Sequence, residues 1–283
     1  MTNTLKFHWQ NFWKYRFLLK EIVRKNVRLQ YRNSSLGMLW SLLQPLLFSL
    51  VLSFVFTHLW GSSDTDGIPR ILYILSGRLL FSFFSDSTQG AMRSVRANSS
   101  IIKKVYVPKY IYPMGTVFSK FVTFSFSLVI LVGFIAYYDI MDGYGYGLHL
   151  RVFFAIVPII ILLVLSMGVG LLLSSISVFF KDTEFIYSVL CNLLFYLSPI
   201  LYSAGNIKSG GSALKWVLRW NPLYGIMMMF RNAIFLTDGS MFAEKPFYYS
   251  LEQLGYTALV AGVVLIAGAY VFYKQQNKFI LHL

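Results

Sequence analysis

Polar and apolar residues recur at helical spacing near the start of the chain, and the charges then stop. Between Phe12 and Arg32, a rotation of about 100° per residue gathers apolar side chains on one face and cations on the other. From Leu36 to Trp60 there is no acid, lysine or arginine, and this run is long enough to cross a bilayer. The pattern predicts an amphipathic helix in the membrane surface that turns directly into a first membrane span. The predicted apolar face, toward the acyl boundary, comprises Phe12, Tyr15, Leu18, Leu19, Ile22, Val23, Val27 and Leu29, and the cationic face comprises Lys14, Lys20, Arg24, Lys25, Arg28 and Arg32.

Five further stretches are apolar enough to cross a bilayer as helices. The second span carries Arg78 and Asp86, and the fourth is long and contains Pro158, which favours a kink or an extension beyond the bilayer. We therefore expect an all-α membrane protein, with a cytoplasmic interface helix over residues 1–34 and a six-span domain over residues 35–283. The predicted spans are approximately residues 36–60, 71–92, 111–138, 152–180, 185–203 and 251–273.

Composition and charge support this architecture and set its orientation. Hydrophobic residues make up 57% of the 283 residues and charged residues 13%, which is far too apolar for a soluble domain. The net charge of +14 does not indicate nucleic-acid binding, because the cations flank apolar runs instead of forming a groove-sized patch. With the N-terminus inside, the cytoplasmic segments hold 16 lysines and arginines and the outer segments seven, which predicts that both termini are cytoplasmic. The lone Cys191 excludes a disulfide framework, and no signal peptide is evident.

Two segments between the spans carry information beyond topology. The inner loop over residues 93–110 has five cations, no acid, and isoleucine and valine among its lysines. It could form a short helix that sits in a groove of a partner protein, or its lysines could only enforce topology. On the outer side, residues 204–250 contain two half-length apolar pieces around Asn221-Pro222. This pattern suggests re-entrant half-helices at the outer leaflet.

The sequence offers little for covalent chemistry. It contains no P-loop, no His-Glu-x-x-His pair, no Gly-x-Ser-x-Gly elbow and no metal-ligand cluster. The four histidines are scattered along the chain. We expect no catalytic residue, no metal and no cofactor bound by this chain itself.

Several motifs together resemble one family of transporters. Residues 31–46, at the start of the first span, resemble the corresponding segment of type-2 ABC permeases that export polysaccharides and polyol phosphates, including O-antigen, capsule and teichoic-acid exporters. The resemblance continues through residues 103–108, 180–183, 195–200 and 220–223, and so covers nearly the whole chain in order. Lys181 departs mildly from it, since an arginine more often precedes the aspartate.

The resemblance implies the partners and the location. It implies a homodimer in the bacterial cytoplasmic membrane, surrounded by membrane lipids, with two separate ATPase subunits that hold ATP and Mg. A lipid-linked glycan or polyol-phosphate polymer would cross between the two permease copies, and the outer half-helices would cap the exit. The N-terminal helix and the loop over residues 93–110 would meet the ATPases. The residues expected at this coupling surface are Lys20, Arg24, Arg28, Ile101, Ile102, Lys103, Lys104, Lys181 and Asp182.

Residues of a sugar path would combine small polar groups with aromatic rings. In the first span Ser41, Pro45, Ser49, Ser53 and Thr57 recur every four residues and form one small, weakly polar ridge. Such a ridge marks either close helix packing or a hydrated wall. Aromatic faces suit the C–H side of a sugar, while a hydroxyl or indole N–H bonds its oxygens. The candidate path residues are Trp40, Ser41, Phe48, Ser49, Ser53, Arg78, Phe83, Phe84, Phe195 and Tyr196.

Three charges within the predicted spans need partners, because an unpaired charge at mid-bilayer costs about 3 kcal/mol or more. Asp86 and Lys120 lie at similar depths in the second and third spans, and we predict that they form a structural ion pair. Arg78 has no evident acidic partner. It either snorkels to the outer headgroups or contacts a pyrophosphate or polyol phosphate in transit.

Two other functions remain open from the residues. A type-2 ABC exporter of drugs or lipids would keep the architecture and change the cargo. A membrane-embedded transferase acting on lipid-linked sugars would need acids or histidines near the membrane surface. The acids of this chain are scattered in loops, which disfavours the transferase.

Overall fold

The chain forms helices almost throughout the part that the computed structural model describes, which is residues 2–32, 34–60, 64–65, 68–105, 107–142, 150–202, 220–235 and 246–282. Two short strands form one antiparallel pair, in which Asp64 is opposite Pro69 and Thr65 is opposite Ile68. The elements in chain order are α1 (Thr2–Tyr31), α2 (Leu39–Trp60), β1 (Asp64–Thr65), β2 (Ile68–Pro69), α3 (Arg70–Ala97), α4 (Ser99–Ile102), α5 (Ile111–Asp142), the 3-10 helix η1 (Leu150–Ala155), α6 (Ile156–Phe179), α7 (Thr183–Leu197), α9 (Pro222–Phe235), α10 (Pro246–Gln275), the 3-10 helix η3 (Gln276–Lys278) and α11 (Phe279–His282).

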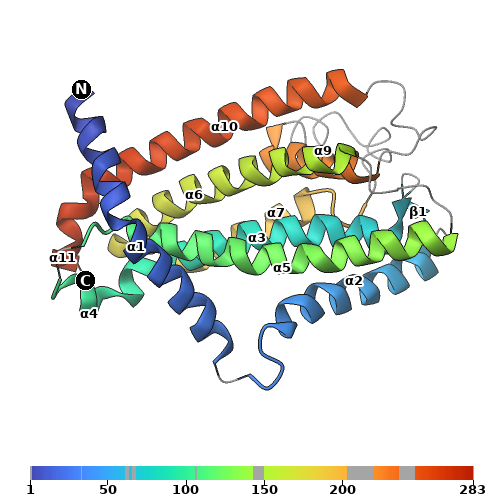
Figure 1. Cartoon of the computed structure of the whole chain (residues 1–283), viewed down its shortest axis with the longest axis horizontal. Helices are drawn as coiled ribbons and strands as arrows, with labels where there is room; N and C mark the ends of the chain where they lie inside the picture. Colours follow the sequence, from blue (N-terminus) through green and yellow to red (C-terminus); the bar gives the residue numbers. More distant parts are fainter. Residues whose placement is uncertain are drawn as a thin grey trace.

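The long helices lie side by side in a bundle with α3 near its centre (Figure 1). α3 packs along both α5 and α6, α10 lies along α6, and α2 contacts α3 and α5. One end of the bundle carries α4 and α11, and we call it the α4 end. The opposite end carries α9 and the strand pair, and we call it the α9 end (Figure 1). Most side chains of α3 are buried, including Leu72, Leu80 and Met92, as expected of a helix surrounded by others.

Four helices of the described chain are long and apolar enough to cross a membrane. They cover Leu39–Leu59, Ile111–Met141, Phe153–Phe179 and Glu252–Leu281, and they correspond to the first, third, fourth and sixth predicted spans. The second predicted span lies within α3, and the fifth begins as the 15-residue α7. The predicted all-helical membrane fold is therefore confirmed in its class, and the number of six spans stays a prediction. Pro158 lies in the first turn of α6, where its missing N–H breaks no helical hydrogen bond and no kink is needed.

Close packing at glycines holds α6 and α10 together. In α6 and α10, a Cβ added to Gly168 would lie 2.6 Å from the backbone nitrogen of Leu265, and one added to Gly268 would meet the backbone of Gly168. The two helices therefore touch backbone to backbone. Since lipid tails are as apolar as leucine, such close contact is what favours association of helices inside a bilayer.

The apolar face of α1 packs against the bundle instead of being left entirely to lipid. α1 contacts α5, and a Cβ on Gly115 would lie 2.6 Å from Cγ2 of Ile22 and 3.6 Å from Cδ1 of Leu19. The exposed residues of α1 include the cations Lys20, Arg24 and Arg28. The predicted amphipathic pattern is present, but part of its apolar face is covered by protein because Gly115 leaves room for the close approach.

The predicted outer half-helices fall only partly on described residues. The first, residues 213–220, lies outside them except for Trp220. The second appears as α9, which begins at Pro222 directly after Asn221, whose side-chain Oδ1 accepts a 3.0 Å hydrogen bond from the backbone N–H of Leu223. The Asn-Pro pair thus caps a helix, as Asn at an N-cap and Pro at the first helical position commonly do.

Candidate functional site

A polar stripe follows one face of the otherwise buried helix α3. Its members are separated by four, three, one and three residues, which places them on one side of the helix. All of them remain at least partly exposed, although α2 and α7 lie on either side. The stripe consists of Arg78, Ser82, Ser85, Asp86 and Gln89.

The stripe forms the floor of a groove of about 510 Å³ between α2, α3 and α7. α2 contributes Phe48 to one wall, and α7 contributes Phe195 and Tyr196 to the other. The guanidinium carbon of Arg78 lies 4.3 Å from the ring centre of Phe48 and 5.4 Å from that of Phe195. Arg78 therefore bridges the two walls by cation–π contacts. The groove is also lined by Phe81, Cys191 and Asn192.

A smaller polar pocket of about 130 Å³ lies on the α5 side of the same stripe. It shares Arg78, Ser82 and Asp86 with the groove, so the two spaces are bordered by one set of charges. Lys120 of α5 lines this pocket and donates a 3.1 Å hydrogen bond to Oε1 of Gln30 at the end of α1. Among the described residues, Asp86 and Lys120 form no contact within 4.0 Å. Both residues line the same pocket, and their structural ion pair, direct or bridged by water, stays a prediction.

The structure places the remaining predicted path residues in three environments. Ser41 and Phe83 line the smaller pocket, and Phe83 also packs on Phe121 and Phe124. Ser49 and Phe84 are buried away from both spaces, and Ser49 donates to the carbonyl of Pro45 at 2.8 Å. Helical rotation turns both side chains toward the interior, and their place in the path stays a prediction. Trp40 is exposed and Ser53 half-buried, and neither lines the groove.

Most residues of the predicted coupling surface are exposed. Lys20, Arg24 and Arg28 are exposed on α1, Lys103 and Lys104 directly after α4, and Lys181 and Asp182 in the turn between α6 and α7. On α4, Ile101 is 40% exposed whereas Ile102 is only 6% exposed. The role of Ile102 in coupling stays a prediction. α4 has a single turn, so neighbouring residues point to different sides, and Ile102 fills the protein core.

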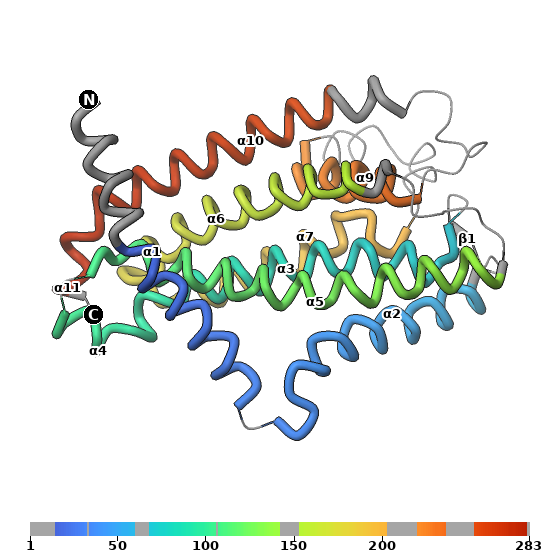
Figure 2. The backbone as a smooth tube through the Cα atoms, viewed as in Figure 1, coloured from blue at the N-terminus to red at the C-terminus, as the bar shows by residue number. Residues whose placement is uncertain are grey.

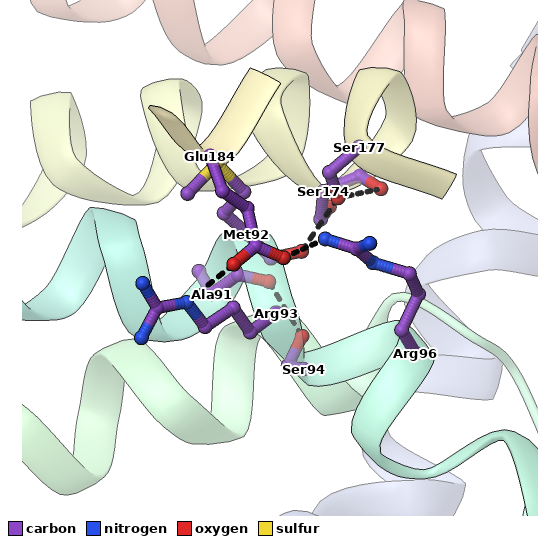
Figure 3. Close-up of polar contacts among 8 residues, drawn as sticks. All are labelled: Ala91, Met92, Arg93, Ser94, Arg96, Ser174, Ser177 and Glu184. Atoms are coloured by element: carbon purple, nitrogen blue, oxygen red, sulfur yellow. Dashed lines mark hydrogen bonds and ion pairs between the residues drawn. The ribbon is translucent and has the colours of Figure 1, made fainter. Parts of the chain in front are cut away.

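An ion-pair junction that the sequence did not suggest joins α3 to α7 at the α4 end (Figure 3). Glu184, in the first turn of α7, accepts a 2.9 Å hydrogen bond from Nε of Arg93 and also pairs with Arg96. Ser177 of α6 donates to the carbonyl of Met92 at 2.7 Å, so three helices meet here. The sequence shows only that Glu184 is one of two acids that follow Lys181 in the third inner loop.

A buried arginine fastens α9 to the start of α3. Arg231 is only 3% exposed, and its Nη1 donates to the carbonyl of Pro199 at 2.7 Å and its Nη2 to that of Tyr73 at 2.8 Å. Its Nε lies 3.3 Å from Oγ of Ser76, and its guanidinium carbon 3.5 Å from the ring centre of Tyr73. From the sequence, Arg231 is only one of the seven cations of the outer segments, because spacing along the chain does not reveal backbone carbonyls as partners.

The groove combines aromatic faces with hydrogen-bond donors and acceptors. Such a surface suits non-covalent contact with a polyhydroxylated ligand. Similarity to known proteins identifies the family. The sequence model of the ABC-2 type transporters matches residues 18–235, which is most of the chain. The chain belongs to the ABC-2 type transporter family.

The relatives of this ABC-2 chain are similar to it over nearly their whole length. An O-antigen export system permease protein RfbA of Klebsiella pneumoniae is 28% identical over 265 residues, covering 93% of each chain. The RfbA protein of Myxococcus xanthus is 27% identical over 272 residues, covering 95% of this chain and 96% of its own. The polysialic acid transport protein KpsM of Escherichia coli is 23% identical over 256 residues, covering 89% of this chain and 91% of its own. The predicted resemblance to polysaccharide-export permeases is confirmed, and the chain is a multi-pass membrane protein.

Proposed function

We propose that this chain is the membrane permease of an ATP-driven exporter that moves a lipid-linked polysaccharide across the bacterial cytoplasmic membrane. The observation that carries the proposal is the groove between α2, α3 and α7, in which a charged stripe faces aromatic walls within an apolar bundle. The full-length similarity to permeases named for O-antigen and polysialic acid export supports polysaccharide over drug or lipid cargo.

The proposed path follows the chemistry of the groove. Arg78 and Asp86 offer a donor and an acceptor to sugar hydroxyls, and Phe48, Phe195 and Tyr196 offer rings to the C–H faces. A bilayer otherwise provides no hydrogen-bonding partner for a polymer rich in hydroxyl groups. A wall of this composition therefore lowers the cost of passage without binding any one sugar tightly.

The proposed assembly is a homodimer with two separate ATPase subunits that hold ATP and Mg. In each copy α3 would be the second span, and α7 with the residues after it the fifth, which gives six spans and cytoplasmic termini. The α4 end would face the cytoplasm, since it carries Arg93, Arg96, Lys103, Lys104 and Lys109. The exposed cations of α1, together with Ile101, Lys103 and Lys104, would meet the ATPase.

Reconstitution tests this function. The chain is co-purified with its proposed ATPase subunit and placed in proteoliposomes with a lipid-linked glycan. ATP-dependent protection of the glycan from an added glycosidase is then measured. Arg78→Gln and Tyr196→Ala should lower transport without lowering assembly with the ATPase. The matched control is Leu193→Ala, because Leu193 is exposed on α7 outside the groove. Full transport by the chain without any ATPase, or full transport by both groove variants, would contradict the proposal.

A further inference from the structure

The last described residues of the chain fold back onto the α4 end of the bundle. α10 ends at Gln275, the 3-10 helix η3 changes the direction of the chain, and α11 carries Phe279 into the interior. Phe279 is completely buried, whereas its neighbour Leu281 is 83% exposed. We call residues 276–282 the C-terminal hook. It lies beyond residue 235, where the match to the ABC-2 family ends.

The hook is fixed by specific contacts to the loop between α4 and α5. Nζ of Lys109 donates a 2.5 Å hydrogen bond to the carbonyl of Gln276 and lies 5.9 Å from the ring centre of Phe279. The Phe279 ring also makes edge contacts with Phe272 and Phe179, with ring centres 5.3 and 5.9 Å apart. Burial lowers the pKa of the Lys109 ammonium group below its usual value. The side chain of Lys109 thus packs against the hook, through Gln276 and Phe279, instead of extending toward solvent.

The same apolar cluster holds both the hook and the loop. Ile102 of α4 and Tyr112 at the start of α5 belong to it together with Phe279. Figure 2 shows α4 and α11 at the same end of the bundle. The cluster is completed by Val95, Leu171, Val178 and Phe272.

The opposite side of the loop faces outward. Ile101, Lys103, Lys104 and Val105 are exposed there, on the surface proposed above for the ATPase. α4 has only one turn, and a single turn of helix is not stable by its own hydrogen bonds. The position of this surface therefore depends on the contacts of its inner side. These are the packing of Ile102 in the apolar cluster and the hydrogen bond from Lys109 to the hook.

We propose that the C-terminal hook positions the α4–α5 loop against the ATPase, so that movement of the ATPase reaches the spans. This inference rests on the proposed function. Phe279 and Lys109 act as positioning residues, since neither is placed at the ATPase surface itself. Without the hook, the loop would yield locally when the ATPase moves, and hydrolysis would continue without moving the cargo.

The experiment compares Phe279→Ala and Lys109→Met with Leu281→Ala, which removes a similar side chain from the exposed side of the same helix. ATP hydrolysis and glycan transport are measured in one proteoliposome preparation. The hook variants should keep hydrolysis near the wild-type rate and lose roughly fivefold or more in glycan transported per ATP, the low end of typical coupling between distant sites. Leu281→Ala should match the wild type, and Phe279→Leu should restore most of the coupling because it remains apolar.

A second measurement tests whether the hook stabilises the α4–α5 loop, and it does not require transport. Hydrogen exchange of the purified wild-type chain and its variants should show faster exchange in residues 99–110 for Phe279→Ala than for Leu281→Ala, with the rest of the bundle unchanged. Unchanged exchange there, or a wild-type ratio of transport to hydrolysis in Phe279→Ala, would overturn the inference. A parallel fall of hydrolysis, transport and thermal stability would also overturn it, since it would show a general structural role. If the wild-type complex moves no glycan, the proposed function fails, and the exchange result still decides the role of the hook.

Discussion

The buried guanidinium of Arg231 gives the sharpest prediction about stability. It occupies space that is open only because residue 77 is a glycine and has no side chain. A Cβ on Gly77 would lie 2.6 Å from Nη2 of Arg231 and 3.4 Å from Cα of Ile200. Gly77→Ala in the wild-type protein therefore forces the guanidinium away from the carbonyls of Tyr73 and Pro199. Overpacking of this kind costs typically about 1–3 kcal/mol of the free energy of unfolding.

Arg231→Met removes the donor and nearly preserves the length of the side chain. The carbonyl of Pro199 loses its 2.7 Å bond and that of Tyr73 its 2.8 Å bond. The carbonyl of Tyr73 keeps a 3.0 Å hydrogen bond from Oγ of Ser76, so the carbonyl of Pro199 is the acceptor that loses its donor. An unsatisfied buried acceptor costs about 1–3 kcal/mol. The gain from no longer burying a charge offsets part of this loss, which places the expected value near the lower end, at about 1–2 kcal/mol.

The double variant isolates the contact itself. Once the guanidinium is gone, the methyl group of Gly77→Ala no longer meets Nη2, so its cost should shrink by about 1 kcal/mol or more. The assay is unfolding of the purified chain by sodium dodecyl sulfate in mixed micelles, followed by circular dichroism for all four proteins. Costs that add to within about 0.5 kcal/mol would refute the reasoning, since residues that do not touch behave in that way. A wild-type stability for Arg231→Met would refute the assigned hydrogen bonds.

Three further outcomes follow from the packing and the charges. Gly268→Ala should lower the thermal midpoint of the purified chain because its methyl group meets the backbone of α6, whereas Gly262→Ala on the same helix has no atom within 4 Å and should be tolerated. Glu184→Gln should cost about 1 kcal/mol or less, because Arg93 is largely exposed, and the difference from the wild type in chemical unfolding should shrink in high salt. Gly115→Leu should push α1 away from α5 at Ile22, and proteolysis at the lysines and arginines of α1 should become faster than in the wild type. An unchanged midpoint, a loss independent of salt, or unchanged cleavage would contradict the respective prediction.

Patterns that depend on one helix at a time were predictable from the sequence. The charge-free runs at residues 36–60 and 152–180 correspond closely to α2 and α6, since length and apolarity alone decide whether a helix can span a bilayer. The two faces of α1 also follow from the helical period. Residue chemistry also identifies part of the groove. Four residues that the sequence offers for a sugar path line it together, namely Phe48, Arg78, Phe195 and Tyr196.

Features that depend on two helices at once were not predictable. The burial of Ile102, the pairing of Glu184 with Arg93 and Arg96, and the carbonyl partners of Arg231 are set by rotation and distance between segments far apart in the chain. A single sequence contains the period of each helix but not its rotation about its axis relative to the others. For the same reason the sequence does not reveal that Ser49 and Phe84 are buried.

Two of the described helices that are not among the four candidate spans, α3 and α7, border the groove together with α2. α3 carries Arg78 and Asp86 at helical spacing, and α7 is short, so neither is among the four helices that satisfy length and hydropathy. This follows from the physics of a bilayer. A helix that faces only lipid and other helices is free to be uniformly apolar, but one that borders a path for a hydrated polymer has to keep polar groups along one face and packing residues along the other. α3 meets both demands, with its stripe toward the groove and Leu80 and Met92 toward its neighbours. Under the proposed function, the low hydropathy of α3 reflects the polar face that it presents to the groove.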